Sequence, residues 1–325
     1  MRWTGNEAAI ERVVVRAPAS TSNLGPGYDV FGLALDVMYD TVEVSPLDTR
    51  TVVVKIEGVG AGRISVDPEK NSAGRTAMEF LERLDGFGVK ICVKKGIPPG
   101  SGLGSSGATA TATVVAVNHL FNLKIDKREL TEIAAKGEIT SAGVAHADNV
   151  APSMYGGFVI IRSYNPLEIL AFPPPSGLEF ALAVPKGIKK TTKEARSVVP
   201  EHVELSRVIH NLGGAATIVA GMLLSNAELV GKGLLGDQIA EPARASLYPG
   251  YLKAKKSALE SGALGVTLSG AGPTVIAIAD REKVNLGQVA QAMREAFEAE
   301  GIECCDYVTR PTTGAYVVEN ATKDV

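Results

Sequence analysis

The strongest constraint in this 325-residue chain is a loop of small residues that leads directly into a helix. Residues 98–107 read PPGSGLGSSG, and residues 108–121, which follow, contain neither proline nor glycine. The first N–H groups of a helix have no partner within it, and glycines let the backbone approach a ligand closely. The loop therefore predicts an anion site at a helix N-terminus, with a nucleotide phosphate as its natural occupant.

Two familiar phosphate-binding loops are alternatives, and neither matches well. A Walker loop ends in Gly-Lys-Ser or Gly-Lys-Thr, whereas residues 98–107 contain no lysine. A dinucleotide fingerprint is matched formally by Gly102, Gly104 and Gly107, but residues 94–99 separate these glycines from the preceding apolar strand. That fingerprint also requires an acidic ribose contact about 20 residues further on, where this sequence has only a polar helix start. A glycine-rich turn with a packing role alone is the remaining alternative.

Composition places the chain among ordinary globular proteins. Apolar residues make up 45% and charged residues 21%, which disfavours disorder, collagen-like repeats and coiled coils. The length suggests two domains or one large one. Lysine and arginine (33) nearly balance aspartate and glutamate (36), so the formal charge of -3 provides no basic field for nucleic acid or an anionic membrane. We therefore expect no nucleic-acid partner and no membrane binding.

The cysteines and the N-terminus bear on location. Three cysteines cannot form a disulfide framework, and the adjacent Cys304 and Cys305 lack the spacing of a zinc site. Residues 1–15 contain no apolar run typical of an export signal, and no segment reaches ~18 uninterrupted apolar residues. These features predict a cytoplasmic protein.

Apolar patterning predicts two domains of mixed α and β structure. Strands are expected at residues 12–17, 41–45, 51–56, 89–94, 179–184, 263–268 and 274–279, with a hairpin at 156–172 and two short strands near the C-terminus. Helices are expected at residues 72–84, 108–121, 127–136, 201–224, 251–261 and 286–300. This irregular alternation favours α+β over a doubly wound parallel sheet. The best linker is PPPSG at residues 173–177, which places the boundary between domains 1–173 and 174–325.

Two further loops of small residues accompany the first. Residues 17–29 read APASTSNLGPGYD and follow the first expected strand, and residues 268–274 read LSGAGPT and join two strands of the second domain. Loops from separate domains can meet at a ligand in the cleft between them. We expect the three loops to converge there.

These three loops, in this order, resemble the signature motifs of the GHMP small-molecule kinases. The family's phosphate loop is similar to Pro-x-x-x-Gly-Leu-Gly-Ser-Ser-Ala, and this chain departs from it only in having Gly107 where alanine is usual. Residues 22–32, SNLGPGYDVFG, resemble the homoserine-phosphorylating branch, which commonly has phenylalanine at the position of Tyr28. Further similar stretches are residues 137–138, 145–152, 191–196 and 241–244.

The resemblance implies a fold and an activity. The fold would be a two-domain GHMP kinase, α+β, with an N-terminal domain like ribosomal protein S5 domain 2, including a left-handed βαβ unit, and a C-terminal antiparallel sheet with helices. The activity would be ATP-dependent phosphorylation of the L-homoserine hydroxyl, with Mg²⁺, by a homodimer. Alternatives are another acceptor (mevalonate, shikimate or a sugar) and a non-catalytic ligand sensor. The presence of Ser105, Ser106 and Glu138 argues against the sensor.

The resemblance also implies which residues bind the nucleotide. They are Asn71, Gly96, Ile97, Pro98, Pro99, Gly100, Ser101, Gly102, Leu103, Gly104, Ser105 and Ser106. Asn71 would touch the adenine or ribose, although it suits a helix N-cap equally well. Ser106 and Glu138 would be magnesium ligands, since hard oxygen donors suit that ion.

The acceptor would be a small zwitterion, which needs a cation for its carboxylate and an anion for its ammonium group. The residues implied to bind it are Asn23, Asp29, His146, Asp148, Asn149, Arg196 and Arg244. The two arginines would hold the carboxylate with help from His146, because guanidinium groups match carboxylates bidentately. Asp29 would hold the ammonium, oriented by Asn23. Catalysis is assigned to Arg196, to Asn149 near the hydroxyl and to Thr192, with no committed base, and Asp148 is the alternative base.

Overall fold

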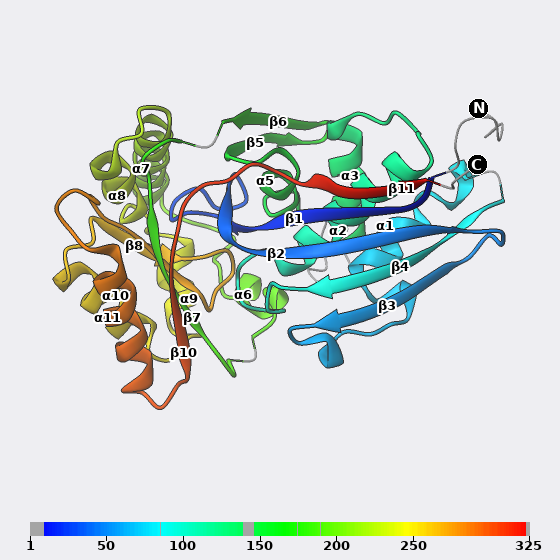
Figure 1. The fold of residues 1–325 in the computed structure, drawn as a ribbon. Helices are drawn as coiled ribbons and strands as arrows, with labels where there is room; N and C mark the ends of the chain where they lie inside the picture. The colour runs from blue at the N-terminus through cyan, green and yellow to red at the C-terminus, as the bar shows by residue number, and fades with distance from the viewer. Residues whose placement is uncertain (1–9, 85, 139–145, 174, 189, 323–325) are drawn as a thin grey trace.

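The computed structural model of the chain describes residues 10–84, 86–138, 146–173, 175–188 and 190–322. Its strands form two sheets that lie side by side (Figure 1). The first sheet contains β1 (Ile10–Ser22), β2 (Phe31–Leu47), β3 (Val52–Gly58), β4 (Gly88–Lys95), β5 (Phe158–Tyr164), β6 (Leu167–Phe172) and β11 (Tyr316–Thr322). The second contains β7 (Phe180–Pro185), β8 (Gly265–Leu268), β9 (Val275–Ile278) and β10 (Cys304–Thr309).

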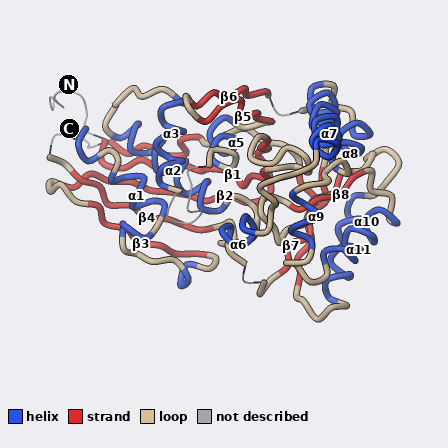
Figure 2. The backbone as a smooth tube through the Cα atoms, turned by 180° about the vertical axis from the view of Figure 1, so that it is seen from behind, coloured by secondary structure: helices blue, strands red, loops and turns tan. Residues whose placement is uncertain are grey.

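The first sheet is mixed. Its order is β11-β1-β2-β4-β3, and the hairpin of β5 and β6 adds to one end of β2. Among the described strands, β3 and β4 form the one parallel pair. One face is covered by α1 (Ser72–Met78), α2 (Ser105–Leu120) and α3 (Lys127–Gly137), as Figure 2 shows from behind. Because α2 is buried on almost every side, it forms the centre of this half of the molecule.

The second sheet is antiparallel, in the order β10-β7-β9-β8. The amphipathic helices α10 (Tyr251–Glu260) and α11 (Leu286–Glu298) pack on it around a separate apolar core. The other helices of this half are α6 (Thr192–Ser197), α7 (Leu205–Leu223), α8 (Ala227–Leu234) and α9 (Ala240–Ala245). Figure 1 shows α6 between the two sheets.

The α+β class, the hairpin and the antiparallel second sheet are confirmed, and three local expectations are corrected. Strand β1 does not end at residue 17 but runs to Ser22, so part of the first motif is strand. The helix expected at residues 72–84 ends at Met78 and is followed by a short 3₁₀ turn, Leu81–Arg83, whose flanking residues Phe80 and Leu84 are buried. The short helices α5 (Val150–Tyr155), α6, α8 and α9 were not expected.

The proposed boundary at residues 173/174 stays a prediction. It falls between β6 and β7, which lie in different sheets, although Pro174 is outside the described residues. The last strand, β11, returns to pair with β1, so the first sheet also contains the end of the described chain. No helix among the described residues is long and apolar enough to cross a membrane.

Candidate active site

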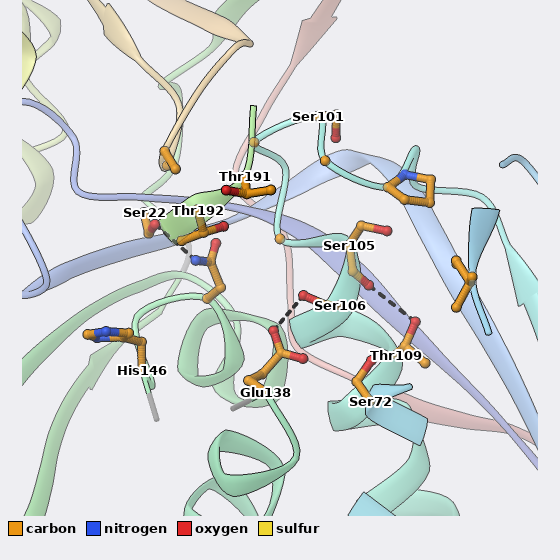
Figure 3. A pocket seen from close by; sticks show the side chains of 18 of the residues that line it. Ser22, Ser72, Ser101, Ser105, Ser106, Thr109, Glu138, His146, Thr191 and Thr192 are labelled. Atoms are coloured by element: carbon orange, nitrogen blue, oxygen red, sulfur yellow. Dashed lines mark hydrogen bonds between the residues drawn. The ribbon is translucent and has the colours of Figure 1, made fainter. Parts of the chain in front are cut away.

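A cleft of about 520 Å³ lies where the loops of the two halves meet. This volume is in the range of small-molecule sites. Figure 3 shows side chains that line it, from β1, α2, the end of α3 and the start of α6.

Hydrogen bonds hold the three loops of small residues together at this cleft. The Asn23 side chain donates to the Gly270 carbonyl (2.7 Å), and the Ser269 hydroxyl donates to the Gly102 carbonyl (2.8 Å). The backbone N–H of Thr274 donates to the Ser101 carbonyl (3.1 Å). The expected convergence of the loops is therefore confirmed.

The phosphate loop presents an uncapped helix N-terminus. Gly104 occupies the N-cap position of α2 with φ 64°, and no side chain caps the helix there. A Cβ on Gly104 would lie 2.1 Å from the Ser20 hydroxyl oxygen, so only glycine fits this close approach. The first N–H groups of α2 are thus left available for an anion.

The loop residues divide into two groups. Those that line the cleft are Pro99, Gly100, Ser101, Gly102, Gly104, Ser105 and Ser106. Ile97 and Leu103 are fully buried in the apolar core, and Gly96 and Pro98 are not part of the cleft lining. Direct nucleotide contact by these four stays a prediction.

Ser106 and Glu138 form a pair of oxygen donors at the foot of the loop. The Ser106 hydroxyl donates to Glu138 Oε2 at 2.5 Å, and Glu138 is only 7% exposed (Figure 3). Burial raises the pKa of Glu138 to about 7, against the opposing effects of the Ser106 hydrogen bond and the Lys95 charge. A hydroxyl and a carboxylate side by side fit a magnesium ion bound mainly through phosphate oxygens and water. Among the residues that the structure describes, no three His, Cys, Asp or Glu side chains gather to hold a metal by themselves.

Asp29 and Arg196 were expected to hold opposite ends of the acceptor, and here they pair with each other. Arg196 donates two parallel hydrogen bonds to the Asp29 carboxylate, at 2.8 and 2.6 Å. Arg196 lines the cleft from the last turn of α6. The Tyr28 ring lies 5.3 Å from its guanidinium carbon and 4.8 Å from that of Arg244.

Arg244 is a buried cation on α9. It is 3% exposed and donates to the carbonyls of Ala195 (2.9 Å) and Gly270 (3.3 Å). Burial lowers its pKa. No carboxylate in the described part of the chain lies within ion-pair distance of it, so a bound carboxylate would satisfy its charge.

His146, Asp148 and Asn149 lie together beside the first loop. Neither ring nitrogen of His146 has a hydrogen-bond partner among the described residues, and its Nδ1 lies 3.9 Å from the Asp29 carboxylate. Burial lowers the pKa of His146 and raises that of Asp148 to about 6. The Asn149 amide donates to the Ser22 hydroxyl (3.0 Å) and accepts from the Ser20 hydroxyl (3.2 Å).

The remaining expected residues have visible local roles. Asn23 Oδ1 accepts from the Asp29 N–H (3.0 Å), so its amide bridges the first and third loops. Asn71 caps α1 by accepting from the Gly74 N–H (2.7 Å), which confirms its N-cap role and leaves nucleotide contact a prediction. Thr192 lines the cleft at the first position of α6.

Sequence reasoning missed four residues near the site: Tyr28, Asp40, Lys95 and Thr109. Tyr28 stands inside the first motif, and its departure from the usual phenylalanine was the available signal. Asp40 lies within a strand with no motif around it, and Lys95 is the last residue of the strand before the phosphate loop.

The chain is similar to known proteins over nearly its whole length. The family model "GHMP kinases N terminal domain" matches residues 71–157, and "GHMP kinases C terminal" matches residues 218–299. A homoserine kinase of Methanococcus vannielii is 38% identical over 95% of this chain and 99% of its own length. The crystal structure of a homoserine kinase from Cytophaga hutchinsonii has a TM-score of 0.88 and 36% identity, covering 98% of this chain and 100% of that one. An L. major mevalonate kinase in complex with R-mevalonate, at 16% identity, TM-score 0.69 and coverage of 92% and 96%, shares the fold alone.

Proposed function

The chain belongs to the GHMP kinase family, and we propose that it transfers the γ-phosphoryl group of ATP to the hydroxyl of L-homoserine. The products are O-phospho-L-homoserine, ADP and the proton of the hydroxyl, which leaves to solvent. One observation carries the proposal: the uncapped N-terminus of α2 and the guanidinium groups of Arg196 and Arg244 line one cleft, with Asp29 paired to Arg196. The first suits a polyphosphate and the second suits a zwitterion. The homoserine kinases that match the chain over nearly its full length support this acceptor.

The proposed catalysis rests on alignment and charge. Phosphoryl transfer passes through a loose transition state that depends mainly on positioning and charge neutralisation. In this proposal the N–H groups at the start of α2 hold phosphate oxygens, and Asn149 and Asp148, which line the same cleft, orient the acceptor hydroxyl. We assign no committed base.

We propose that Mg²⁺ enters with ATP and is held by Ser106 and Glu138. When bound, the ion would neutralise charge on the phosphate oxygens. The chain's part is to present the Ser106 hydroxyl and an ionised Glu138 carboxylate, which already lie 2.5 Å apart.

Acceptor binding breaks the Asp29–Arg196 ion pair, and the acceptor supplies a new partner for each of these two residues. The homoserine carboxylate binds Arg244 and Arg196, and its ammonium takes the place of Arg196 on Asp29. An acceptor with a carboxylate but no ammonium, such as mevalonate or shikimate, would draw Arg196 away and leave Asp29 without a cation. Leaving a half-buried charge unpaired is unfavourable, so the pair favours an amino acid.

A coupled ADP-release assay over a panel of alcohols tests the proposal. L-homoserine should stimulate ADP release in the presence of Mg²⁺, and its O-methyl ether, which lacks the reacting hydroxyl, is the matched control. Stimulation by mevalonate, shikimate or a sugar but not by homoserine would support the second candidate, a GHMP kinase with another acceptor. Magnesium-ATP binding with no turnover on any alcohol would favour the sensor.

We further propose a second copy of the chain as partner. Helix α7 exposes Leu205 (72%), Ile209 (62%) and Leu212 (68%), which share one face. Apolar patches of this kind mark interaction surfaces. Sedimentation should give a dimer that Ile209→Lys dissociates, and a monomeric wild-type protein would refute the proposal.

A further inference from the structure

A buried ion pair lies at the base of the phosphate loop, and the function proposed above gives it no contact with a ligand. It joins Asp40 of β2 to Lys95 of β4, and the two side chains are 0% and 2% exposed. Two charges can be buried without a large penalty only where hydrogen bonds satisfy each of them. The groups that form hydrogen bonds with Asp40 and Lys95 therefore show which backbone segments the pair fixes.

Asp40 holds the start of the loop. Its Oδ1 accepts from the backbone N–H groups of Gly96 (3.0 Å) and Ile97 (3.1 Å). Its Oδ2 accepts from the Thr109 hydroxyl (2.6 Å) and from Lys95 Nζ. A carboxylate has about four acceptor positions, and all four are used here.

Lys95 holds the end of the loop. Its ammonium donates to Asp40, to the Ser105 carbonyl (2.9 Å) and to the Thr109 hydroxyl (2.8 Å). Ser105 and Thr109 form the first turn of α2, where the phosphate-binding N–H groups lie. An ammonium has three donors. Because protein oxygens take all three, Lys95 has no hydrogen left for a phosphate, although it reaches the cleft lining.

We infer that Asp40 and Lys95 are positioning residues for ATP, which fix both ends of the phosphate loop and the first turn of α2 without touching the nucleotide. This inference rests on the ATP-binding part of the proposed function. A loop rich in glycine does not hold one conformation by itself, because glycine leaves the backbone free to adopt many. Asp40 and Lys95 supply the missing restraint from two neighbouring strands. Loss of the pair should misplace the phosphates while the acceptor residues, which other elements carry, stay in position.

The experiment compares Asp40→Asn, Lys95→Met and the double variant with Lys94→Met, a matched control at the exposed neighbouring position of β4. Calorimetric titration with magnesium-ATP measures affinity without an acceptor, steady-state kinetics separate the two KM values, and urea unfolding measures stability. Each single variant leaves one buried charge unpaired and should be the less stable protein. The double variant removes both charges and should recover stability.

The expected result is that the double variant folds stably and still has a kcat/KM for ATP lowered by up to roughly 100-fold, the effect of slight misplacement. Its KM for L-homoserine should be unchanged. Recovery of both stability and ATP affinity in the double variant would make the pair merely structural and overturn the inference. Tighter ATP binding by Asp40→Asn would also overturn it, because the freed lysine would then be a phosphate ligand. If the wild-type protein bound no ATP, the proposed function and the inference would fail together.

Discussion

Replacing Glu138 by glutamine should make the nucleotide-free protein more stable at neutral and higher pH while it abolishes magnesium-dependent turnover. The reason is the burial of an acidic side chain. Burial raises the pKa of Glu138 from its ordinary 4.5 to about 7. At about 1.4 kcal/mol per pH unit, this gap corresponds to roughly 3 kcal/mol.

The direction of the pH dependence follows from the protonation of Glu138 in the folded and in the unfolded chain. Below about pH 4.5 the carboxyl is protonated in both the folded and the unfolded chain, so the wild type and Glu138→Gln should differ little. Between pH 4.5 and 7 the unfolded chain ionises first, and folding stability falls. Above pH 7 the full cost of roughly 3 kcal/mol is present in the wild type and absent from the variant. Asp148, whose pKa is also raised, contributes a pH dependence of stability to the wild type and to the variant alike.

Urea unfolding in the presence of a metal chelator, at several values between pH 4.5 and 8.5, measures this difference. The advantage of Glu138→Gln should grow with pH and level off above pH 7. Glu132→Gln is the control, since this glutamate lies on α3 at a partly exposed position and should show no such growth. A stability difference that is flat with pH, or a variant that is less stable at pH 8.5, would refute the reasoning.

Three further substitutions test the site. Arg196→Ala should lower kcat/KM for homoserine by about 100-fold or more, because it removes a guanidinium group proposed to bind the acceptor carboxylate; near-normal kinetics would exclude a carboxylate-binding role. Ser106→Ala should raise the magnesium concentration needed for half-maximal rate by about tenfold, the value of one hydrogen bond to a charged group. An unchanged magnesium dependence would reject Ser106 as a ligand. Asp148→Asn should keep substantial activity if no base is required, whereas a loss of about 10⁴-fold would identify a general base.

The local parts of the site could be predicted from the sequence because their signals are local. A run of glycines followed by a stretch without glycine or proline specifies a helix N-terminus, and α2 begins at Ser105 as that pattern requires. The presence of small-residue loops in both expected domains predicted their convergence, which the hydrogen bond from Asn23 to Gly270 confirms. Asp126, directly before α3, also carries a local N-cap signal, and its side chain accepts from the Glu129 N–H.

The other parts of the site depend on contacts between residues far apart in the chain, which leave no local sequence pattern. Asp40 and Lys95 meet because β2 and β4 are neighbours, and nothing within either strand predicts that contact. The six-residue helices α6 and α9 carry Arg196 and Arg244 but are too short for a helical period to be recognised. The Asp29–Arg196 pair joins residues 167 positions apart and was assigned instead to two ends of a ligand.

The return of β11 to the first sheet makes that sheet depend on a contact between distant parts of the chain. Val13 of β1 pairs with Asn320 of β11, and pairings so far apart in sequence form slowly during folding. Before β11 docks, this edge of β1 is open and could pair with another chain. A variant truncated before Tyr316 is therefore expected to keep both sheets, to expose the edge of β1 and to aggregate.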